Sequence, residues 1–511
     1  MRKLSYKIFT IILVIILTMA PLDALAVEGT MGYSAGISVV NPIEKSEYQY
    51  SEMCFLTGVP IKLSGTLTIK KTDKNDVVTA TYTYRLNNAE ADVTMNRVLI
   101  YTTTRETKAN GQVTESTKLS RVPTEVINIG GTAYRLIDAS FTQSMITDPK
   151  AAINYHTGEF SEKKVYAIGT GTTRDTVTVT LSGRTYAYDQ YWSSTETQRI
   201  NMMVETDLRS TNPPVQWGGA AEIVVSSATL HQVNYSENEP TYISFDGGYV
   251  KKQWMESTLD YTARFPEFDK NGLPTDVLKT YNSTESLSTQ IELSRLMVPD
   301  IKHLNGHWAE EPISILFGLE ILPGTGENFR VGKYLTRREF VGILMNALKE
   351  IPADTDVRVS STTHSRRTSN KNVPEISPFK DVEPGDLYYN EIKKAYQKGI
   401  TSGNGNGNFG PNIYITSAEA IKMIVSALGL ENLAPYPAAT TPFTDNDSIP
   451  AYARNAASVA AILGIIEPDY MGRFNPSNRL TSENAANLMY DLINYMGKEL
   501  IKDYRDRIID F

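Results

Sequence analysis

The residues best suited to chemistry lie at the predicted start of a helix near the middle of the chain. Thr336 and Glu339 have the spacing of a capping box, in which the threonine hydroxyl accepts from the third helical amide and the glutamate reaches back to the cap amide. Arg337 follows the cap and is expected to point away from the apolar side of the helix. Because a cation in the first turn slightly opposes the helix dipole, a functional role is favoured. An arginine beside free helical amides suits a carboxylate or phosphate. A solvated surface arginine is the alternative.

Two residues upstream of Arg337 are further candidates for contact with a carbohydrate. The indole ring of Trp308 could stack on the apolar face of a pyranose, or could equally belong to the core. Asp300 is better suited to capping a helix or fixing a loop than to touching a sugar. Capping alone explains the pattern at Thr336. The candidate binding residues are therefore Arg337, Trp308, Asp300 and Thr336, with Arg337 the strongest.

Common catalytic motifs are absent from the sequence. Residues 27–296 contain no HExxH, no Gly-x-Ser-x-Gly and no Cys/His ligand cluster, since Cys54 is the only cysteine and the two histidines of this region, His156 and His231, are isolated. We therefore predict no catalytic residue, no metal site and no cofactor. A glycosidase needs only two carboxylates brought together by the fold, so a carbohydrate-binding or glycan-hydrolysing role stays open for residues 27–296.

Residues 27–296 show the two-residue period of β-strands. Ile61, Leu63, Leu67 and Ile69 alternate with polar residues, and the dipeptide Asn110-Gly111 is typical of a hairpin turn. We predict an all-β, antiparallel, sandwich-like region of one or two domains, in which each strand has one solvated face.

From residue 297 onward the period changes to that of helices. Phe340, Ile343, Leu344 and Ala347 form an apolar stripe at helical spacing, and equivalent stripes begin at Ala420 and Ala485. We predict an all-α C-terminal region with three such helices.

One pattern occurs three times in the helical region, at 297–351, 375–431 and 440–497. Each copy has a phenylalanine followed seven residues later by a threonine: Phe329 and Thr336, Phe409 and Thr416, Phe474 and Thr481. Between the first two copies, 352–374 is rich in serine and threonine without periodicity and is expected to be a flexible loop. Residues 498–511 are expected to be a polar tail.

This pattern resembles the S-layer homology family. The family has an opening Phe-x-Asp, matched by Phe379-Lys380-Asp381, and a Thr-Arg-Ala-Glu start to its second helix, matched most closely at Thr336-Arg337. The resemblance implies a pseudo-threefold bundle of three repeats with grooves between them. It also implies that Arg337 binds an acidic, often pyruvylated, secondary cell-wall polysaccharide through the ketal carboxylate.

The second and third copies depart from the family pattern at the positions that would bind this ligand. Ser417 and Ser482 replace the arginine, and Asn484 replaces the final glutamate of the third copy. The tryptophan position is Leu387 in the second copy and Tyr452 in the third. We therefore expect one fully equipped groove and two weaker ones.

The ends and the charge of the chain bound its location and partners. Residues 1–26 have a basic start, an apolar run and an Ala-x-Ala step, which predict a secretory signal peptide and no membrane span after its cleavage. A formal net charge of −8 argues against a nucleic-acid partner. We predict a secreted bacterial protein of the cell wall or S-layer, bound through its repeats to wall polysaccharide, with other S-layer subunits as further candidate partners. The β region would be a structural or interaction module, or alternatively a carbohydrate-binding or hydrolytic one.

Overall fold

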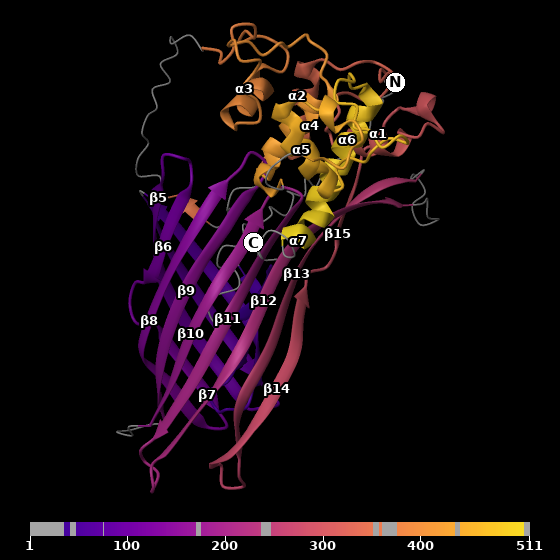
Figure 1. Cartoon of the computed structure of the whole chain (residues 1–511). Coiled ribbons are helices and arrows are strands. Elements are labelled where there is room, and N and C mark those ends of the chain that lie inside the picture. Colours follow the sequence, from indigo (N-terminus) through magenta and orange to yellow (C-terminus); the bar gives the residue numbers. More distant parts are fainter. Residues whose placement is uncertain are drawn as a thin grey trace, which may run out of the picture.

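A computed structural model describes residues 35–40, 47–74, 76–169, 175–236, 247–350, 357–359, 376–434 and 440–504 (Figure 1). The predicted signal peptide and most of the predicted loop at 352–374 lie outside these residues. In the described part of the chain, no helix is both long and apolar enough to span a bilayer.

The N-terminal region is an antiparallel β-sheet, as the alternating pattern predicts. Its strands are β1 (Gly36–Val40), β2 (Glu47–Cys54), β3 (Ile61–Lys74), β4 (Val77–Asn88), β5 (Val93–Thr107), β6 (Val113–Leu119), β7 (Thr124–Ile129), β8 (Thr132–Pro149), β9 (Asn154–Ile168), β10 (Thr176–Asp189), β11 (Ser193–Leu208), β12 (Val215–Ser236), β13 (Gly248–Phe268), β14 (Pro274–Ser288) and β15 (Glu292–Arg295). They follow one another in a single sheet from β1 to β14, with β7 and β15 beside the main path. A short strand from the C-terminal half, β16 (Val357–Val359), pairs in parallel with β3.

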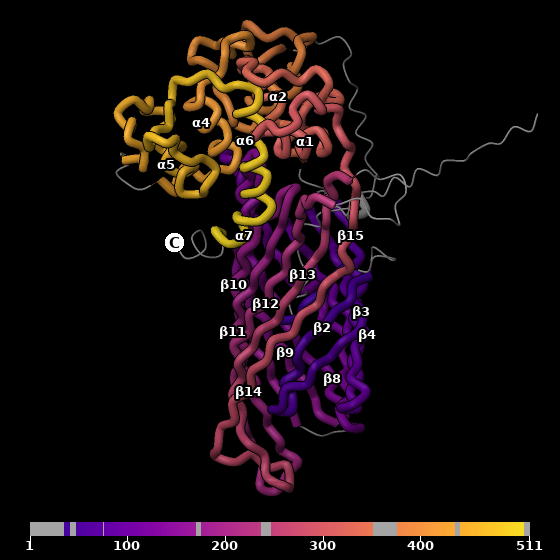
Figure 2. The backbone as a smooth tube through the Cα atoms, turned by 90° about the vertical axis from the view of Figure 1, so that its right-hand side faces the viewer, coloured from indigo at the N-terminus to yellow at the C-terminus, as the bar shows by residue number. Residues whose placement is uncertain are grey.

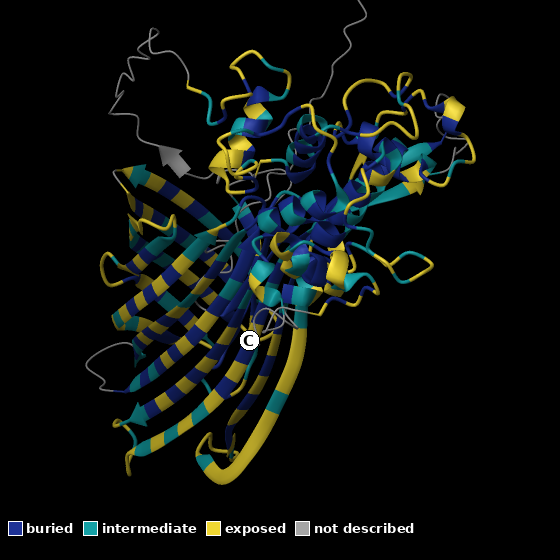
Figure 3. Ribbon diagram, turned by 45° about the horizontal axis from the view of Figure 1, so that its top comes forward, coloured by how far each residue is buried: buried dark blue, intermediate teal, exposed yellow. Residues whose placement is uncertain are grey.

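Strong twist rolls this one sheet so that its two halves face each other. Ile37 and Leu67 from the first strands share a core with Val177, Ile223 and Leu259 from the later ones. Strand β1 lies across the later strands, where the Ser257 hydroxyl donates to the Ser38 carbonyl at 2.7 Å. Bands of buried and exposed residues alternate along the strands (Figure 3). The two facing layers therefore come from one continuous sheet, because long strands accumulate right-handed twist.

The C-terminal region consists of short helices joined by irregular loops at one end of the sheet (Figures 1 and 2). Its α-helices are α1 (Glu310–Gly318), α2 (Arg337–Leu348), α3 (Tyr389–Gln397), α4 (Ser417–Leu428), α5 (Ala451–Ile462), α6 (Ser482–Asn494) and α7 (Leu500–Asp503). Short turns of helix are η1 (Lys302–Leu304), η2 (Glu431–Leu433), η3 (Asn446–Ser448) and the π-helical η4 (Tyr495–Glu499). The expected all-α character is thus met only in part, since loops fill much of the region and three isolated β-bridges join them.

These bridges close a ring of backbone hydrogen bonds among the three copies of the repeat. The Leu335 amide donates to Leu480, the Leu480 amide to Ile415 and the Ile415 amide to Leu335, each at 3.0 Å. All three residues directly precede the threonine that caps the second helix of their repeat. The segment before each second helix is therefore held at a common centre.

The open ends of the second helices rest on the β-sheet. Trp192 donates its indole N–H to the Ala347 carbonyl of α2 at 2.8 Å, and the Ala152 amide donates to Ala427 of α4 at 2.9 Å. The hydroxyl of Ser193 donates to the Met496 carbonyl, just after α6, at 2.7 Å. The last carbonyls of a helix have no partner within it. Here residues at the β8–β9 and β10–β11 turns donate hydrogen bonds to carbonyls at these helix ends.

Candidate functional site

A large groove lies between the repeats and has a volume of about 950 Å³. Its wall is formed mainly by the loop and helix start of the third copy, together with residues of α4 and the loop before α1. The residues that matter for its chemistry are Trp308, Tyr334, Glu467, Arg473, Arg479 and Asp491. This volume lies at the upper end of the range typical of small-ligand pockets, about 300–1,000 Å³.

Trp308 is the exposed aromatic residue of this groove. Its side chain is 59% exposed, so it does not belong to the core, and it lies before α1. The equivalent residues, Leu387 and Tyr452, are also exposed. This position faces solvent in all three copies, and only the first copy supplies an indole suited to a sugar face.

Two arginines of the third copy supply positive charge in the groove. Arg473 and Arg479 are both exposed. The guanidinium of Arg479 lies 5.0 Å from the ring centre of Tyr414 and 6.0 Å from that of Tyr334. Stacking on two rings fixes the Arg479 guanidinium while leaving its edge able to donate to an anion.

Sequence reasoning missed these two arginines because it followed the family position occupied by Arg337. A signal for Arg479 existed, since it stands two residues before Thr481, where the other copies have Tyr334 and Tyr414. The ring of backbone hydrogen bonds brings these three aligned positions together. For Arg473 we find no comparable signal.

Arg337 lies inside the boundary between the first two copies, and it is not among the residues that line the groove. It is only 5% exposed, its Nε donates to the Phe409 carbonyl at 2.9 Å, and its guanidinium lies 5.1 Å from the Phe409 ring centre. Nη1 pairs with Glu419 at 2.5 Å. The structure therefore does not show the free, outward guanidinium that the sequence suggested.

Thr336 and Asp300 also lie in structural settings. Thr336 and Glu339 form the predicted capping box at the start of α2. The backbone of Asp300 donates to Thr325 at 2.8 Å, and its side chain is exposed. In the second copy the matching Asp381 accepts from the amides of Phe409 and Gly410 at 2.7 and 2.8 Å, so there it fixes the loop before α4.

One carboxylate of the groove has a shifted pKa. Burial, with Glu467 nearby, raises the pKa of Asp491 to about 6. The Asn487 side chain donates to the Asp491 carboxylate at 2.7 Å. The negative charge of this groove wall therefore falls as the pH drops from neutral to mildly acidic.

A second groove, of about 420 Å³, also has Trp308 in its lining. It lies between the β12–β13 ends and α1, and its lining includes Tyr235, Tyr249, Trp308 and Glu311. Tyr235 is 60% exposed. The indole of Trp308 is thus shared by two grooves, one within the repeats and one at the β-sheet.

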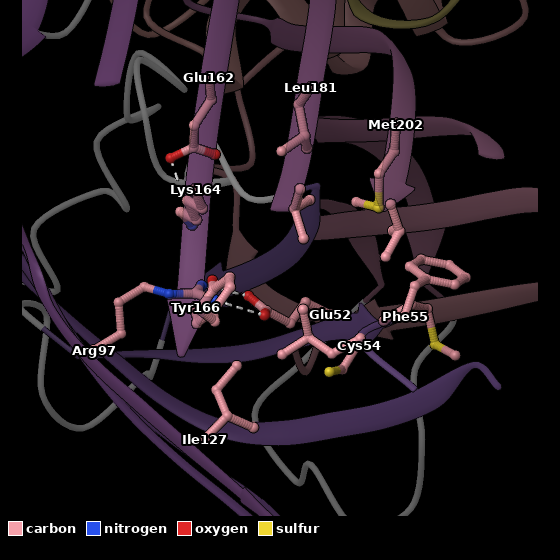
Figure 4. A pocket seen from close by; sticks show the side chains of 14 residues that line it. Glu52, Cys54, Phe55, Arg97, Ile127, Glu162, Lys164, Tyr166, Leu181 and Met202 are labelled. Atoms are coloured by element: carbon pink, nitrogen blue, oxygen red, sulfur yellow. Dashed lines mark hydrogen bonds and ion pairs between the residues drawn. The ribbon is translucent and has the colours of Figure 1, made fainter. Parts of the chain in front are cut away.

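A cluster of charged residues is sealed inside the β region (Figure 4). Arg97 pairs with Glu52 at 2.7 Å and with Glu125 at 2.8 Å, and Lys164 lies 3.4 Å from Glu162. Burial alone would raise the pKa of Glu125, but the charges of Arg97 and Lys164 and the hydrogen bonds from Arg97 and Tyr166 outweigh it and lower that pKa to about 2. Burial raises the pKa of Glu162.

This cluster meets one requirement of a glycosidase, convergent carboxylates, but lacks room for a substrate. The cavity beside it measures about 40 Å³. That is space for a few water molecules and not for a sugar ring. Its chemistry is that of a buried ion-pair network that fixes the packing of the two halves of the sheet.

Comparison with known proteins identifies the repeats. Residues 300–341 and 378–421 match the S-layer homology domain. The chain is 30% identical over 201 residues to an amylopullulanase of Thermoanaerobacterium thermosulfurigenes, covering 38% of this chain and 9% of that protein. It is 30% identical over 200 residues to exoglucanase XynX of Acetivibrio thermocellus, covering 37% and 16%. It is 26% identical over 197 residues to a surface-layer 125 kDa protein of Lysinibacillus sphaericus, covering 38% and 14%.

These matches support anchoring to the cell wall and a bacterial surface location. The chain spans less than a fifth of the length of each of these three relatives. The similarity therefore identifies S-layer homology domains of a secreted protein associated with the cell wall or S-layer, and it leaves the role of the β region open.

Proposed function

We propose that the C-terminal region, built on S-layer homology domains, anchors this protein non-covalently to a secondary cell-wall polysaccharide. The observation that carries the proposal is the groove of about 950 Å³ whose lining includes the exposed Trp308 together with Arg473 and Arg479. An indole matches the apolar face of a pyranose, and the arginines match the carboxylates of an acidic glycan, such as a pyruvyl ketal.

The third copy completes the binding unit in this proposal, although the family match covers only the first two. Asp445 accepts from the Phe474 and Asn475 amides at 2.9 and 2.8 Å, as Asp381 does from Phe409 and Gly410. The hydrogen-bond ring through Leu335, Ile415 and Leu480 supports a pseudo-threefold arrangement. The groove with the arginines then belongs to the third copy, with Trp308 contributed by the first.

Arg337 acts in this proposal by positioning, because its guanidinium is occupied by Glu419 and Phe409. It joins α2 to the start of α4 and so sets the relation between the first two copies. Thr336 caps the start of α2. Asp300 lies in the loop at the start of the first copy, where its amide donates to the Thr325 carbonyl. Of the four candidate binding residues predicted from the sequence, Trp308 is the one that we place in contact with the glycan.

For the β region we propose a structural or interaction role at the cell surface. The buried carboxylates of the β region surround a cavity of only about 40 Å³, which is too small for a sugar. This supports an ion-pair network rather than a hydrolytic site. A carbohydrate-binding role is the second candidate, and the groove with Tyr235, Tyr249 and Trp308 favours it over a hydrolytic one.

Co-sedimentation with purified wall sacculi tests the anchor. The full mature chain is expected to pellet with native sacculi and to stay in solution after acid removal of the secondary polysaccharide. Trp308→Ala and Arg479→Ala are each expected to weaken binding about fivefold or more, since loss of an aromatic or a charged contact costs ~1–3 kcal/mol. Trp308→Phe should recover part of the affinity.

Leu387→Ala is the matched control, because it alters the same exposed position of the second copy. It should bind as the unmodified chain does. Pelleting that survives acid stripping would contradict a polysaccharide ligand. Pelleting lost on stripping but unchanged by Trp308→Ala and Arg479→Ala would retain the anchor and reject this groove.

A further inference from the structure

Strand β14 is exposed along most of its length, unlike the strands beside it, although Tyr281 and Leu287 on one face pack against the core of the sheet. Eleven of its fifteen residues are exposed, whereas its neighbour β13 alternates between buried and exposed residues along most of its length. Val277 and Leu278 are 56% and 63% exposed. β14 pairs with β13 on one side and has no hydrogen-bonded strand on its other side in the described part of the chain (Figure 1).

A free edge of this length can pair with another strand. Unpaired N–H and C=O groups along an edge are a template for strand addition, and natural proteins commonly protect such edges by shortening them or by placing proline, a bulge or several lysines there. β14 runs for fifteen residues, its proline stands at the first position, and it contains a single lysine. The edge therefore lacks the usual protection.

The charges of β14 select one partner and one register. When two copies of a strand pair antiparallel about a two-fold axis normal to the sheet, residues opposite each other lie on the same face, so their numbers differ by an even amount. The charged residues are Asp276, Lys279 and Glu285, and among them only Lys279 and Glu285 are opposite charges on one face. They oppose each other when Asn282 lies on the axis.

The same register matches the other side chains. Val277 then lies opposite Leu287, and Thr280 lies opposite Thr284, which are favourable cross-strand pairs. Parallel in-register pairing would instead place Lys279 opposite Lys279 and Glu285 opposite Glu285, which is unfavourable. Glu285 is already held in place by an ion pair with Lys62 of β3, and Lys279 lies 5.1 Å from the ring centre of Tyr281.

We infer that β14 is a self-association edge, through which two copies of this chain join their sheets antiparallel with Asn282 on the two-fold axis. The axis reverses the strand direction, and the helical region lies at one end of each sheet (Figure 2). The two anchoring regions then lie at opposite ends of the joined sheet. Such a dimer can link two wall surfaces, and its formation does not depend on polysaccharide binding.

Single-cysteine substitutions on the full mature chain test the register. The native Cys54 is buried and does not interfere. Asn282→Cys is expected to form a disulfide-linked dimer under mild oxidation, because residues opposed in an antiparallel pair have Cα atoms about 4.5–5.5 Å apart, within disulfide reach. Thr280→Cys and Thr284→Cys are expected to remain monomeric alone and to cross-link when mixed. Equal cross-linking of all three alone, or of none, overturns the inference.

Charge reversal gives a second test that requires no oxidation. Lys279→Glu and Glu285→Lys are each expected to abolish dimers in analytical ultracentrifugation, because like charges then face each other. An equimolar mixture of the two variants is expected to recover heterodimers, since each unlike pair is restored. Lys270→Glu, in the exposed turn before β14, is the matched control and should leave the dimer intact. A monomeric unmodified chain at high concentration, or unrestored mixtures, refutes self-association through this edge.

Discussion

Arg337 shows how one residue can look like a ligand-binding group in sequence and lie inside an interface in structure. Its first-turn position opposes the helix dipole, and in the sequence this conflict favours a functional role. The conflict is resolved by Glu419, which is 82 residues away in the chain and pairs with the guanidinium. The carbonyl and ring of Phe409 complete the site.

We therefore expect Arg337→Ala to lower the free energy of unfolding rather than to remove a direct contact with the ligand. Removing the guanidinium leaves a half-buried carboxylate and a buried carbonyl without their partner, at a cost of about 2–3 kcal/mol. Urea unfolding of the full chain followed by near-ultraviolet circular dichroism measures the change. Arg330→Ala, at an exposed position of the same repeat, is the control and should alter the unfolding free energy by less than ~0.5 kcal/mol. Equal losses from the two variants would refute the interface role.

Glu125 makes the β region sensitive to acid. Its pKa is lowered to about 2 in the folded chain against an ordinary value of 4.5, so the folded state binds fewer protons than the unfolded state between these values. The stability that this carboxylate contributes is present above pH ~4.5 and is lost as the pH falls towards 2. Guanidinium unfolding between pH 2 and 7 should show this loss, with a shallower slope in Glu125→Gln. Glu159→Gln, at an exposed site, should keep the slope.

At the scale of the helix, the third repeat has an incomplete cap. Thr336 and Thr416 form full capping boxes with Glu339 and Glu419, whereas Thr481 accepts from the amide of Asn484. Asn484→Glu is expected to raise stability by about 0.5–1 kcal/mol, because it supplies the reciprocal hydrogen bond and an acid in the first turn. Thermal unfolding at low and at high salt measures the gain, because salt screens both the interaction with the helix dipole and the repulsion from other groove carboxylates. Asn484→Gln should give only the hydrogen-bond part, and a destabilised Asn484→Glu would contradict the expectation.

Elements with local periodicity were the most predictable part of this chain. The alternation of Leu63 and Leu67 with polar residues gave the strands, and the capping box at Thr336 gave the start of α2. The groove was harder to predict, because Trp308 and Arg479 come from different copies of the repeat and line one groove only in the folded chain. Likewise, alternation shows which face of a strand is buried, but it does not show that all the strands belong to one rolled sheet.

At the scale of the whole molecule, the anchor and the β region share a core. The cluster that fills the repeats also contains Ala152, Tyr188 and Trp192 from the β-hairpin ends. Near the end of the described chain, the Tyr504 hydroxyl donates to the Ala187 carbonyl at 2.9 Å, so the segment after the third repeat also lies against the sheet. The helical region is therefore docked on the sheet rather than joined to it by the chain alone.

This docking predicts coupled unfolding of the two regions. Trp192 is 2% exposed and donates to the end of α2, so Trp192→Ala removes both a buried ring and the cap of that helix. The free energy of unfolding is expected to fall by about 3–5 kcal/mol, and the contact between the two regions is expected to be weakened most. Calorimetry should then resolve two transitions where the unmodified chain shows one, and amides of α2 should exchange faster with deuterium.

The control for this experiment is a tryptophan far from the contact. Trp217 packs against Phe268, with ring centres 5.3 Å apart, and belongs to the β region alone. Trp217→Ala should destabilise the sheet without separating the transitions, because the helix ends keep their partners. If Trp192→Ala also unfolds in a single step, the two regions are coupled by more than this contact. If the unmodified chain already unfolds in two steps, the coupling that the docking predicts is refuted.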